Sequence, residues 1–132
     1  MASRLVFRLA ALAPLVILAS CSNALNPFCG SSRPAPLIGS LSPSTLTFTQ
    51  VQQGVLLKVS GNNFVPASEL VINGKTLGAT IVSNQQLQIM LTSSVITGPG
   101  AVNVKVTTPS GNVGDVGCTS GGTTSALVLT VQ

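Results

Sequence analysis

Histidine, tryptophan and tyrosine are absent from this 132-residue chain, and only Glu69 and Asp115 are acidic. Without histidine, the chain cannot build a histidine-based catalytic triad or a zinc site of the usual kind. A paired-carboxylate glycosidase would need both acids in one cleft, yet we expect them in different loops. A calcium site needs several oxygen ligands with negative charge, and one acidic residue per loop supplies too few of them. We therefore expect no enzyme, no cofactor and no metal site.

Basic residues are also few, and they form no run. Six lysine and arginine residues are spread along the sequence, with no Trp, Tyr or His beside them. This is unlike the basic, aromatic surface of a nucleic-acid-binding protein, so no nucleic-acid partner is expected. Lys58, Lys75 and Lys105 are predicted to lie on solvated strand faces and turn tips.

The first 20 residues have the layout of an export signal. Arg4 and Arg8 precede an apolar run at residues 9–19, LAALAPLVILA, and small residues follow it. The run is too short to span a bilayer comfortably, and Pro14 argues against a stable core helix. We predict a signal peptide over residues 1–20 that is removed from the mature chain.

Residues 18–21, Leu-Ala-Ser-Cys, resemble the lipobox of bacterial lipoproteins. The resemblance implies that the signal is cut before Cys21, which is acylated, with palmitate for example, and becomes the first residue. Several acyl chains would anchor the protein firmly, since one alone binds membranes only marginally. Ser22 stands where an aspartate would favour the inner membrane, which implies the outer membrane of the cell envelope. The alternative is a secreted protein cut near Ala19 or Ser20.

The predicted mature chain has 132 − 20 = 112 residues, enough for one domain with its own core. Its four basic and two acidic residues give it a net charge of +2. Residues 21–36 are rich in Ser, Asn, Gly and Pro and show no periodicity, which predicts a flexible tether. The tether would hold a domain over residues 37–132 near the membrane surface.

From Leu37 onward, apolar and polar residues alternate in five short segments. A period of two is typical of half-buried strands, and turn residues fill the short connections. No segment shows a helical period at helical length. The pattern predicts an all-β fold, a sandwich or a barrel. The predicted strands are residues 55–60, 70–73, 87–92, 102–107 and 127–132.

Two connections have specific turn chemistry. Asn73-Gly74 predicts a two-residue hairpin, because both residues tolerate positive φ. Gly61-Asn62-Asn63 is predicted to break a strand before Phe64. Turn chemistry alone explains this second segment, and a ligand loop is the alternative.

Several segments, in order and at matching spacing, resemble an IPT/TIG domain. This resemblance covers about residues 37–132 and implies an immunoglobulin-like β-sandwich, in which Phe64 is a buried aromatic between the sheets. The segments are IGSLSPST at 38–45, SGNNF at 60–64, LVINGK at 70–75, LQIML at 87–91, GPGAVNVKVTTPSG at 98–111 and LVLTV at 127–131.

The segment at residues 111–125, GNVGDVGCTSGGTTS, is longer and richer in glycine than the turn expected of that family. It contains Cys118, and Cys29 lies in the predicted tether. In an exported chain these two cysteines predict one disulfide, with two unpaired thiols as the alternative. A long loop on a rigid scaffold is where binding usually sits, so this loop is the predicted contact surface. Its candidate binding residues are Asn112, Asp115, Thr119 and Ser120.

These predictions favour a non-catalytic, membrane-anchored module of the cell envelope that contacts a protein or a glycan, or spaces other domains. The mature chain has only three aromatic residues, Phe28, Phe48 and Phe64, which favours protein over glycan. Two alternatives stay open. An exposed edge strand could pair with a partner in an envelope assembly such as a secretion system or pilus. An undetected hydrolase, using for instance a serine–lysine dyad, has no signature here.

Overall fold

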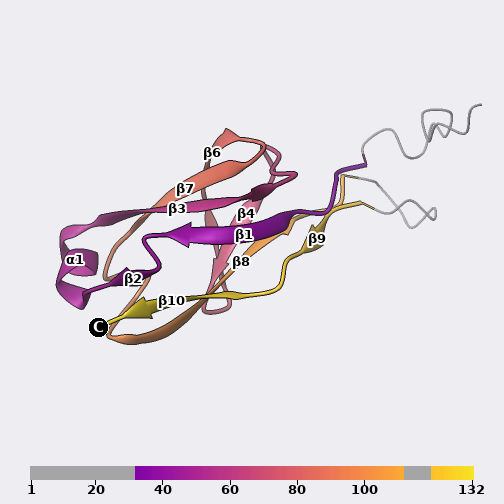
Figure 1. Cartoon of the computed structure of the whole chain (residues 1–132). Coiled ribbons are helices and arrows are strands. Elements are labelled where there is room, and N and C mark those ends of the chain that lie inside the picture. The colour runs from indigo at the N-terminus through magenta and orange to yellow at the C-terminus, as the bar shows by residue number, and fades with distance from the viewer. Residues whose placement is uncertain (1–31, 112–119) are drawn as a thin grey trace, which may run out of the picture.

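Two β-sheets face each other around one hydrophobic core in a computed structural model of the chain, which describes residues 32–111 and 120–132 (Figure 1). No helix in this described part is long and apolar enough to cross a membrane. The elements are β1 (Leu37–Ser42), β2 (Thr45–Leu46), α1 (Phe48–Gln53), β3 (Val55–Asn62), β4 (Glu69–Ile72), β5 (Lys75–Gly78), β6 (Thr80–Ser83), β7 (Gln86–Leu91), β8 (Gly100–Thr108), β9 (Gly122–Thr123) and β10 (Leu127–Val131).

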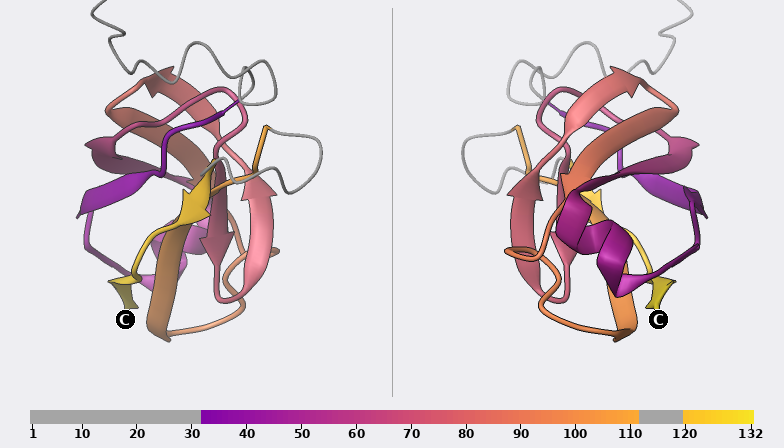
Figure 2. Two further views of the ribbon diagram at one scale, coloured as in Figure 1. Left: turned by 90° about the vertical axis from the view of Figure 1, so that its right-hand side faces the viewer. Right: turned by 90° about the vertical axis from the view of Figure 1, so that its left-hand side faces the viewer.

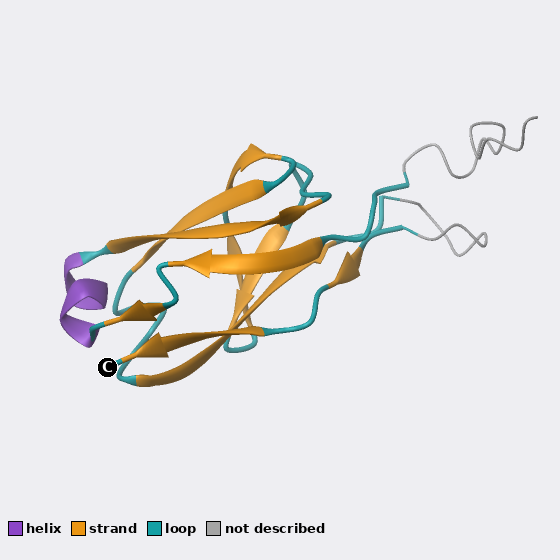
Figure 3. Cartoon of the chain, in the orientation of Figure 1, coloured by secondary structure: helices purple, strands orange, loops and turns teal. Residues whose placement is uncertain are grey.

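The strand order is β1-β3-β7-β6 in one sheet and β2-β10-β8-β4-β5 in the other, with β9 beside β8 (Figure 3). All pairs are antiparallel except β2 with β10, which is parallel. The chain crosses from one sheet to the other between β1 and β2, so β1 belongs to the first sheet and β2 to the second. The predicted all-β sandwich is confirmed.

In all five predicted strands, every buried residue lies on the face that was predicted to be buried. In β3, for example, Leu57 and Val59 are buried, whereas Leu56 and Lys58 are exposed. Full burial of a Val, Leu or Phe side chain stabilises a fold by about 1.5–3 kcal/mol. The apolar side chains on the inward faces of the strands therefore supply most of the stability of the domain. The buried apolar residues are Leu46, Val51, Leu57, Val59, Phe64, Leu70, Ile72, Leu87, Leu91, Ile96, Val102, Val104, Val106, Leu129 and Val131.

A short helix, α1, lies outside the period-two pattern and was missed by the sequence analysis. It has six residues and buries only Val51, so it shows no helical period. Local chemistry nevertheless marks it. Thr47 Oγ1 accepts from the Gln50 amide at 3.3 Å, and Gln50 Oε1 accepts from the Thr47 amide at 2.9 Å. This capping box starts the helix, and Gly54, with φ 85°, ends it.

Strand β3 continues further than predicted. Gly61 and Asn62 still belong to the strand, and Asn63, with φ 62°, is the residue that turns the chain. The strand therefore breaks before Phe64 as predicted, but at Asn63 and not over all three residues of the segment. The glycine is required for space instead, because a Cβ at this position would overlap the Leu37 carbonyl oxygen and lie 2.6 Å from the Phe64 ring. Gly61 thus leaves room for the ring of Phe64, the one buried aromatic residue among the described residues, and for the close approach of β1 to β3.

The hairpin between β4 and β5 has the predicted two-residue turn. Ile72 pairs with Lys75, and the two residues between them have positive φ, 48° at Asn73 and 81° at Gly74. Positive φ at both central positions is the type I′ pattern, whose twist matches that of the flanking strands. The turn therefore sets the register of this edge of the sheet.

We predict that Gly74→Val destabilises the domain by roughly 1 kcal/mol or more, because a β-branched residue resists positive φ. Chemical denaturation of the purified protein measures the change. Gly78→Val is the matched control: a Cβ has open space at both glycines, but only Gly74 has positive φ. Equal stability of the two variants would contradict the assigned turn.

Candidate functional site

The predicted contact loop leaves the sandwich at the end of β8 and returns to β10. The structure describes its two limbs, residues 109–111 and 120–126, but not the tip. Acylation, the disulfide and most of the candidate contact residues therefore stay predictions. Outside the described residues lie Cys21, Phe28, Cys29, Asn112, Asp115, Cys118 and Thr119.

Ser120 is the candidate residue that the structure does place, and its side chain holds two segments together. Its Oγ accepts from the Arg33 amide at 2.8 Å and from the Gly111 amide at 3.1 Å. The Gly121 amide donates to the Arg33 carbonyl at 2.7 Å, and Arg33 Nη1 donates to the Pro109 carbonyl at 3.0 Å. We call this arrangement of residues 32–36, 109–111 and 120–122 the N-terminal clamp.

Gly121 makes the clamp sterically possible. Its φ is 69°, which favours glycine, and a Cβ here would overlap the Thr108 carbonyl oxygen. The same Cβ would lie 2.9 Å from the Pro109 carbonyl carbon and 3.0 Å from the Ser110 amide nitrogen. Only glycine lets the returning limb of the loop come this close to the outgoing limb.

The clamp also fixes the last five residues of the predicted tether. Pro36 is buried, and Asn63 Nδ2 donates to the Ala35 carbonyl at 3.0 Å. Together with the Arg33 contacts, these interactions attach residues 32–36 along one end of the sandwich. The clamp therefore joins the N-terminal segment, the β3–β4 connection and the base of the long loop.

Hydroxyl groups secure the strand end behind the clamp. Ser68 Oγ and Thr108 Oγ1 lie 2.8 Å apart, both residues are buried, and Ser68 Oγ also accepts from the Val65 amide at 3.0 Å. Thr124 pairs with Val106: its Oγ1 accepts from the Val106 amide at 3.0 Å, and its own amide donates to the Val106 carbonyl at 2.9 Å. A buried hydroxyl without a partner is costly, so this pairing favours one position of the strand end.

The clamp lies at the end of the sandwich opposite α1. In Figure 1 the N-terminal segment and the loop limbs are on the right, and α1 and the C-terminus are on the left. Figure 2 shows these two ends in turn, with the clamp end facing the viewer in one view and α1 in the other. The molecule therefore has two distinct ends, separated by strands such as the nine-residue β8, which is about 30 Å long at about 3.3 Å per residue.

Acidic groups do not gather in the described residues. Glu69 is the first residue of β4, opposite Thr107 of β8, rather than in a loop as predicted. Within residues 32–111 and 120–132, no three His, Cys, Asp or Glu side chains lie close enough together to hold a metal ion.

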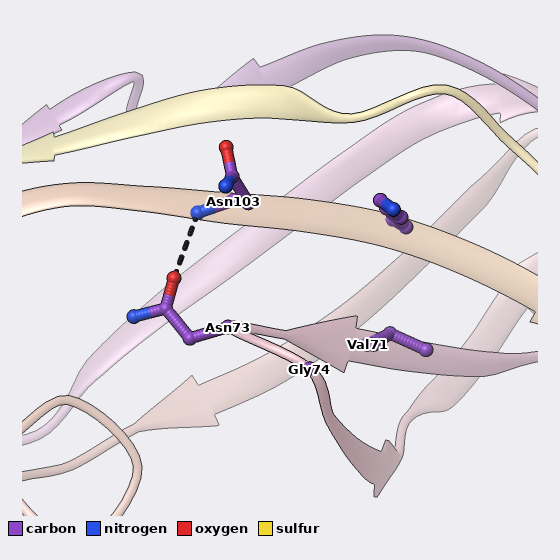
Figure 4. Close-up of a pocket in the computed structure, with 5 residues that line it drawn as sticks. Val71, Asn73, Gly74 and Asn103 are labelled. Carbon is purple, nitrogen blue, oxygen red and sulfur yellow. Dashed lines mark hydrogen bonds between the residues drawn. The ribbon is translucent and has the colours of Figure 1, made fainter.

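A shallow hollow of about 120 Å³ lies on the outer face of β4 and β8, at the hairpin tip. There Asn73 Oδ1 accepts from the Asn103 amide at 3.0 Å, and the Asn73 amide donates to the Asn103 carbonyl at 3.0 Å (Figure 4). Typical ligand pockets measure about 300–1,000 Å³, so this hollow is small. The side chain of Asn73 fixes the hairpin to β8, a role that the turn pattern did not reveal.

A family model described as IPT/TIG domain matches residues 36–126. The chain belongs to the IPT/TIG domain family. This match and the two-sheet architecture confirm the predicted resemblance and the immunoglobulin-like fold. Phe64, 3% exposed, is buried as the resemblance implied.

Two solved structures are similar to this IPT/TIG chain. One is an auxiliary nutrient binding protein from Bacteroides ovatus, 20% identical, with a TM-score of 0.45. It covers 75% of this chain and 21% of its own. The other, from Bacteroides thetaiotaomicron, has the provisional name of a phosphatase; it is 17% identical, with a TM-score of 0.47, and covers 77% and 20%. This chain thus corresponds to about one fifth of each. No curated protein matches the sequence.

We predict that Ser120→Ala destabilises the domain by about 1–3 kcal/mol, because the half-buried amides of Arg33 and Gly111 both lose their acceptor. The measurement is the free energy of unfolding in denaturant. Ser125→Ala is the control, since Ser125 is exposed and outside the clamp. If both substitutions change stability equally little, Ser120 does not hold the clamp.

Proposed function

We propose that this protein is a lipid-anchored, non-catalytic module of the cell envelope, on the outer membrane, that contacts another protein. The main support for this proposal is the N-terminal clamp, because it attaches the segment that follows Cys21 to one defined end of the sandwich. An acylated Cys21 would leave the ten residues 22–31 before the clamp. Even fully extended, they span about 35 Å at most.

This attachment gives the anchored domain a polarity. The clamp and the base of the long loop would lie nearest the anchor, and α1 and the C-terminus, which are at the opposite end of the sandwich, would lie far from it. The two outer sheet faces stand between these ends and are available to a partner. A tether bound over its last five residues supports display of the domain at short range from the membrane.

The chemistry of the chain supports contact rather than catalysis. The whole sequence lacks histidine, and its acids are Glu69, on the outer face of a sheet, and Asp115, outside the described residues. Outward side chains of the central strands are mostly uncharged, such as Ser60 of β3 and Thr130 of β10, with exposed apolar residues between them. Such a surface offers hydrogen bonds and apolar area without a converging set of reactive groups.

A protein partner is favoured over a glycan by the placement of the aromatic rings. Phe64 is buried, and Phe48 packs against the core from α1. Neither ring is presented as a flat platform of the kind that sugars stack on. Instead, the exposed apolar side chains are aliphatic: Leu56 pairs with Met90 across β3 and β7, and Val128 lies on β10. Spacing of other domains is the alternative role.

Labelled palmitate should be incorporated into the wild-type protein in a lipoprotein-processing bacterium, and Cys21→Ser should abolish incorporation. The reason is that acylation needs the thiol of the residue after the signal. Cys118→Ser keeps its lipid and is the control. A wild-type protein that stays unlabelled, or that begins at another residue, would contradict the anchor.

We also propose a disulfide between Cys29 and Cys118, because an oxidising envelope pairs the two thiols that acylation leaves. Cys29 precedes Arg33 by four residues, and Cys118 precedes Ser120 by two, while Arg33 and Ser120 are hydrogen-bonded. The two cysteines are thus only four and two residues away from a pair of residues that touch. Because an extended chain covers at most about 3.6 Å per residue, these short segments would keep both thiols near that pair. The clamp therefore supports the pairing.

This bridge would join residues 118 − 29 = 89 positions apart. On the chain-entropy model, a loop of that size stabilises a fold by about 4–5 kcal/mol at most. Mass spectrometry of unreduced protein from an oxidising envelope should find one peptide pair linked through Cys29 and Cys118. Two free thiols in that protein would contradict the proposal.

A further inference from the structure

Three of the four sheet edges carry features that hinder pairing with another strand. β1 has a bulge between Ile38 and Ser40, and β6 has one between Ile81 and Ser83. β5 has only four residues and begins with the exposed Lys75. Bulges, short length and edge lysines are the usual protection of an edge strand.

The fourth edge, on the β10 side, is only partly covered. β8 pairs with all five residues of β10, but β2 pairs only with Thr130 and Val131. Among the described residues, no strand is therefore hydrogen-bonded to residues 127–129, Leu-Val-Leu, on that side, and these three residues contain no charge, proline or bulge. We call this stretch the bare edge of β10.

Backbone groups at the bare edge point outward. The Thr130 amide donates to the Ser44 carbonyl at 3.0 Å, and the Gln132 amide donates to the Leu46 carbonyl at 2.8 Å. These bonds point away from β8. Because backbone groups alternate in direction along a strand, the N–H and C=O of Val128 face the same side as β2, but lie before its first residue, Thr45.

A hollow lies beside this edge, between β1 and β10. Its volume is about 360 Å³, within the range of ligand pockets. Val128 is 54% exposed, although it is large and apolar. The lining residues are all uncharged: Gly39, Ser40, Leu41, Ser44, Leu127 and Val128.

We propose that the bare edge of β10 binds an extended, uncharged segment of a partner protein, which pairs with Val128 as an added strand. It would continue, on the same side of β10, the pairing that β2 begins. Main-chain hydrogen bonds would supply affinity, as in other cases of strand addition. Every second side chain would enter the hollow beside Leu41 and Leu127, so those positions of the segment are apolar.

A single extended segment fits this edge better than a second copy of the chain. β1 of the other sheet lies beside β10 (Figure 1), so the bare edge is flanked by a second strand. Two such edges on two copies would each be shielded by their own β1, whereas a free strand can enter. The absence of charged lining residues favours an uncharged segment over an acidic or basic one.

The test uses the full chain in detergent and the peptide acetyl-Thr-Val-Thr-Val-Thr-amide, with amide exchange read residue by residue by NMR. In the free protein, the Val128 amide should exchange at least about tenfold faster than that of Leu129, which faces β8. Saturating peptide should slow exchange at Val128 severalfold. Slow exchange at Val128 before peptide is added, or peptide-induced changes elsewhere only, would overturn the proposal.

A matched pair of variants tests the edge itself. Val128→Lys places a charge at the bare edge and should weaken peptide binding at least about tenfold. Val82→Lys is the control, because Val82 is equally exposed, at 52%, but lies on the bulged edge strand β6. Equal affinity of the two variants would overturn the proposal, and so would a dimer that forms without peptide and is lost in Val128→Lys.

The inference rests on the proposed protein contact but not on the lipid anchor. Cys21→Ser should therefore bind the peptide as the wild type does. If palmitate labelling fails while peptide binding persists, only the anchor is wrong. If labelling succeeds while Val128→Lys binds normally, only the assigned edge is wrong.

Discussion

Burial of the inward faces of β3, β7, β8 and β10 is the constraint on which the rest of the structure depends. These faces are built from leucine, valine and isoleucine. Phe64, in the connection after β3, is the one buried aromatic residue among the described residues. A slip of one residue in any of these strands would exchange its buried and exposed faces. Features that set the register, such as the Asn73-Gly74 turn and the close approach at Gly61, therefore matter beyond their own contacts.

This rigid sandwich determines where the N-terminal clamp and the bare edge lie. The end of β8 is fixed by the buried hydroxyl pair of Ser68 and Thr108, and the limbs of the long loop start from that point. The sheet change between β1 and β2 leaves β2 only two residues long, which uncovers β10 at Val128. One end of the sandwich thus binds the N-terminal segment. At the edge of the second sheet, no described strand pairs with the backbone N–H and C=O of Val128.

The sequence predicted the parts of the structure that depend on local periodicity. The five alternating segments became β3, β4, β7, β8 and β10, with the expected faces buried, and the Asn-Gly turn followed from tolerance of positive φ. The four-residue strands β5 and β6 and the six-residue helix α1 are too short to show a period. Only the capping pair of Thr47 and Gln50 signalled the helix.

The candidate site was less predictable, because it depends on contacts between distant parts of the chain. Ser120 was predicted as a contact residue of the loop, but its hydroxyl accepts from Arg33, 87 positions away. No local pattern reveals such a partner. The bare edge of β10 was equally unpredictable from the sequence, since it depends on where β2 begins rather than on the composition of β10.

The proposed lipid anchor would give the domain a polarity relative to the membrane, and depth-dependent fluorescence quenching tests this polarity directly. The acylated protein would be placed in vesicles that contain quencher-labelled lipid, with a fluorophore at exposed Pro34 in the clamp or at exposed Gln52 in α1. If the clamp faces the membrane, quenching is stronger at Pro34 than at Gln52. Equal quenching at the two sites, or stronger quenching at Gln52, would contradict it.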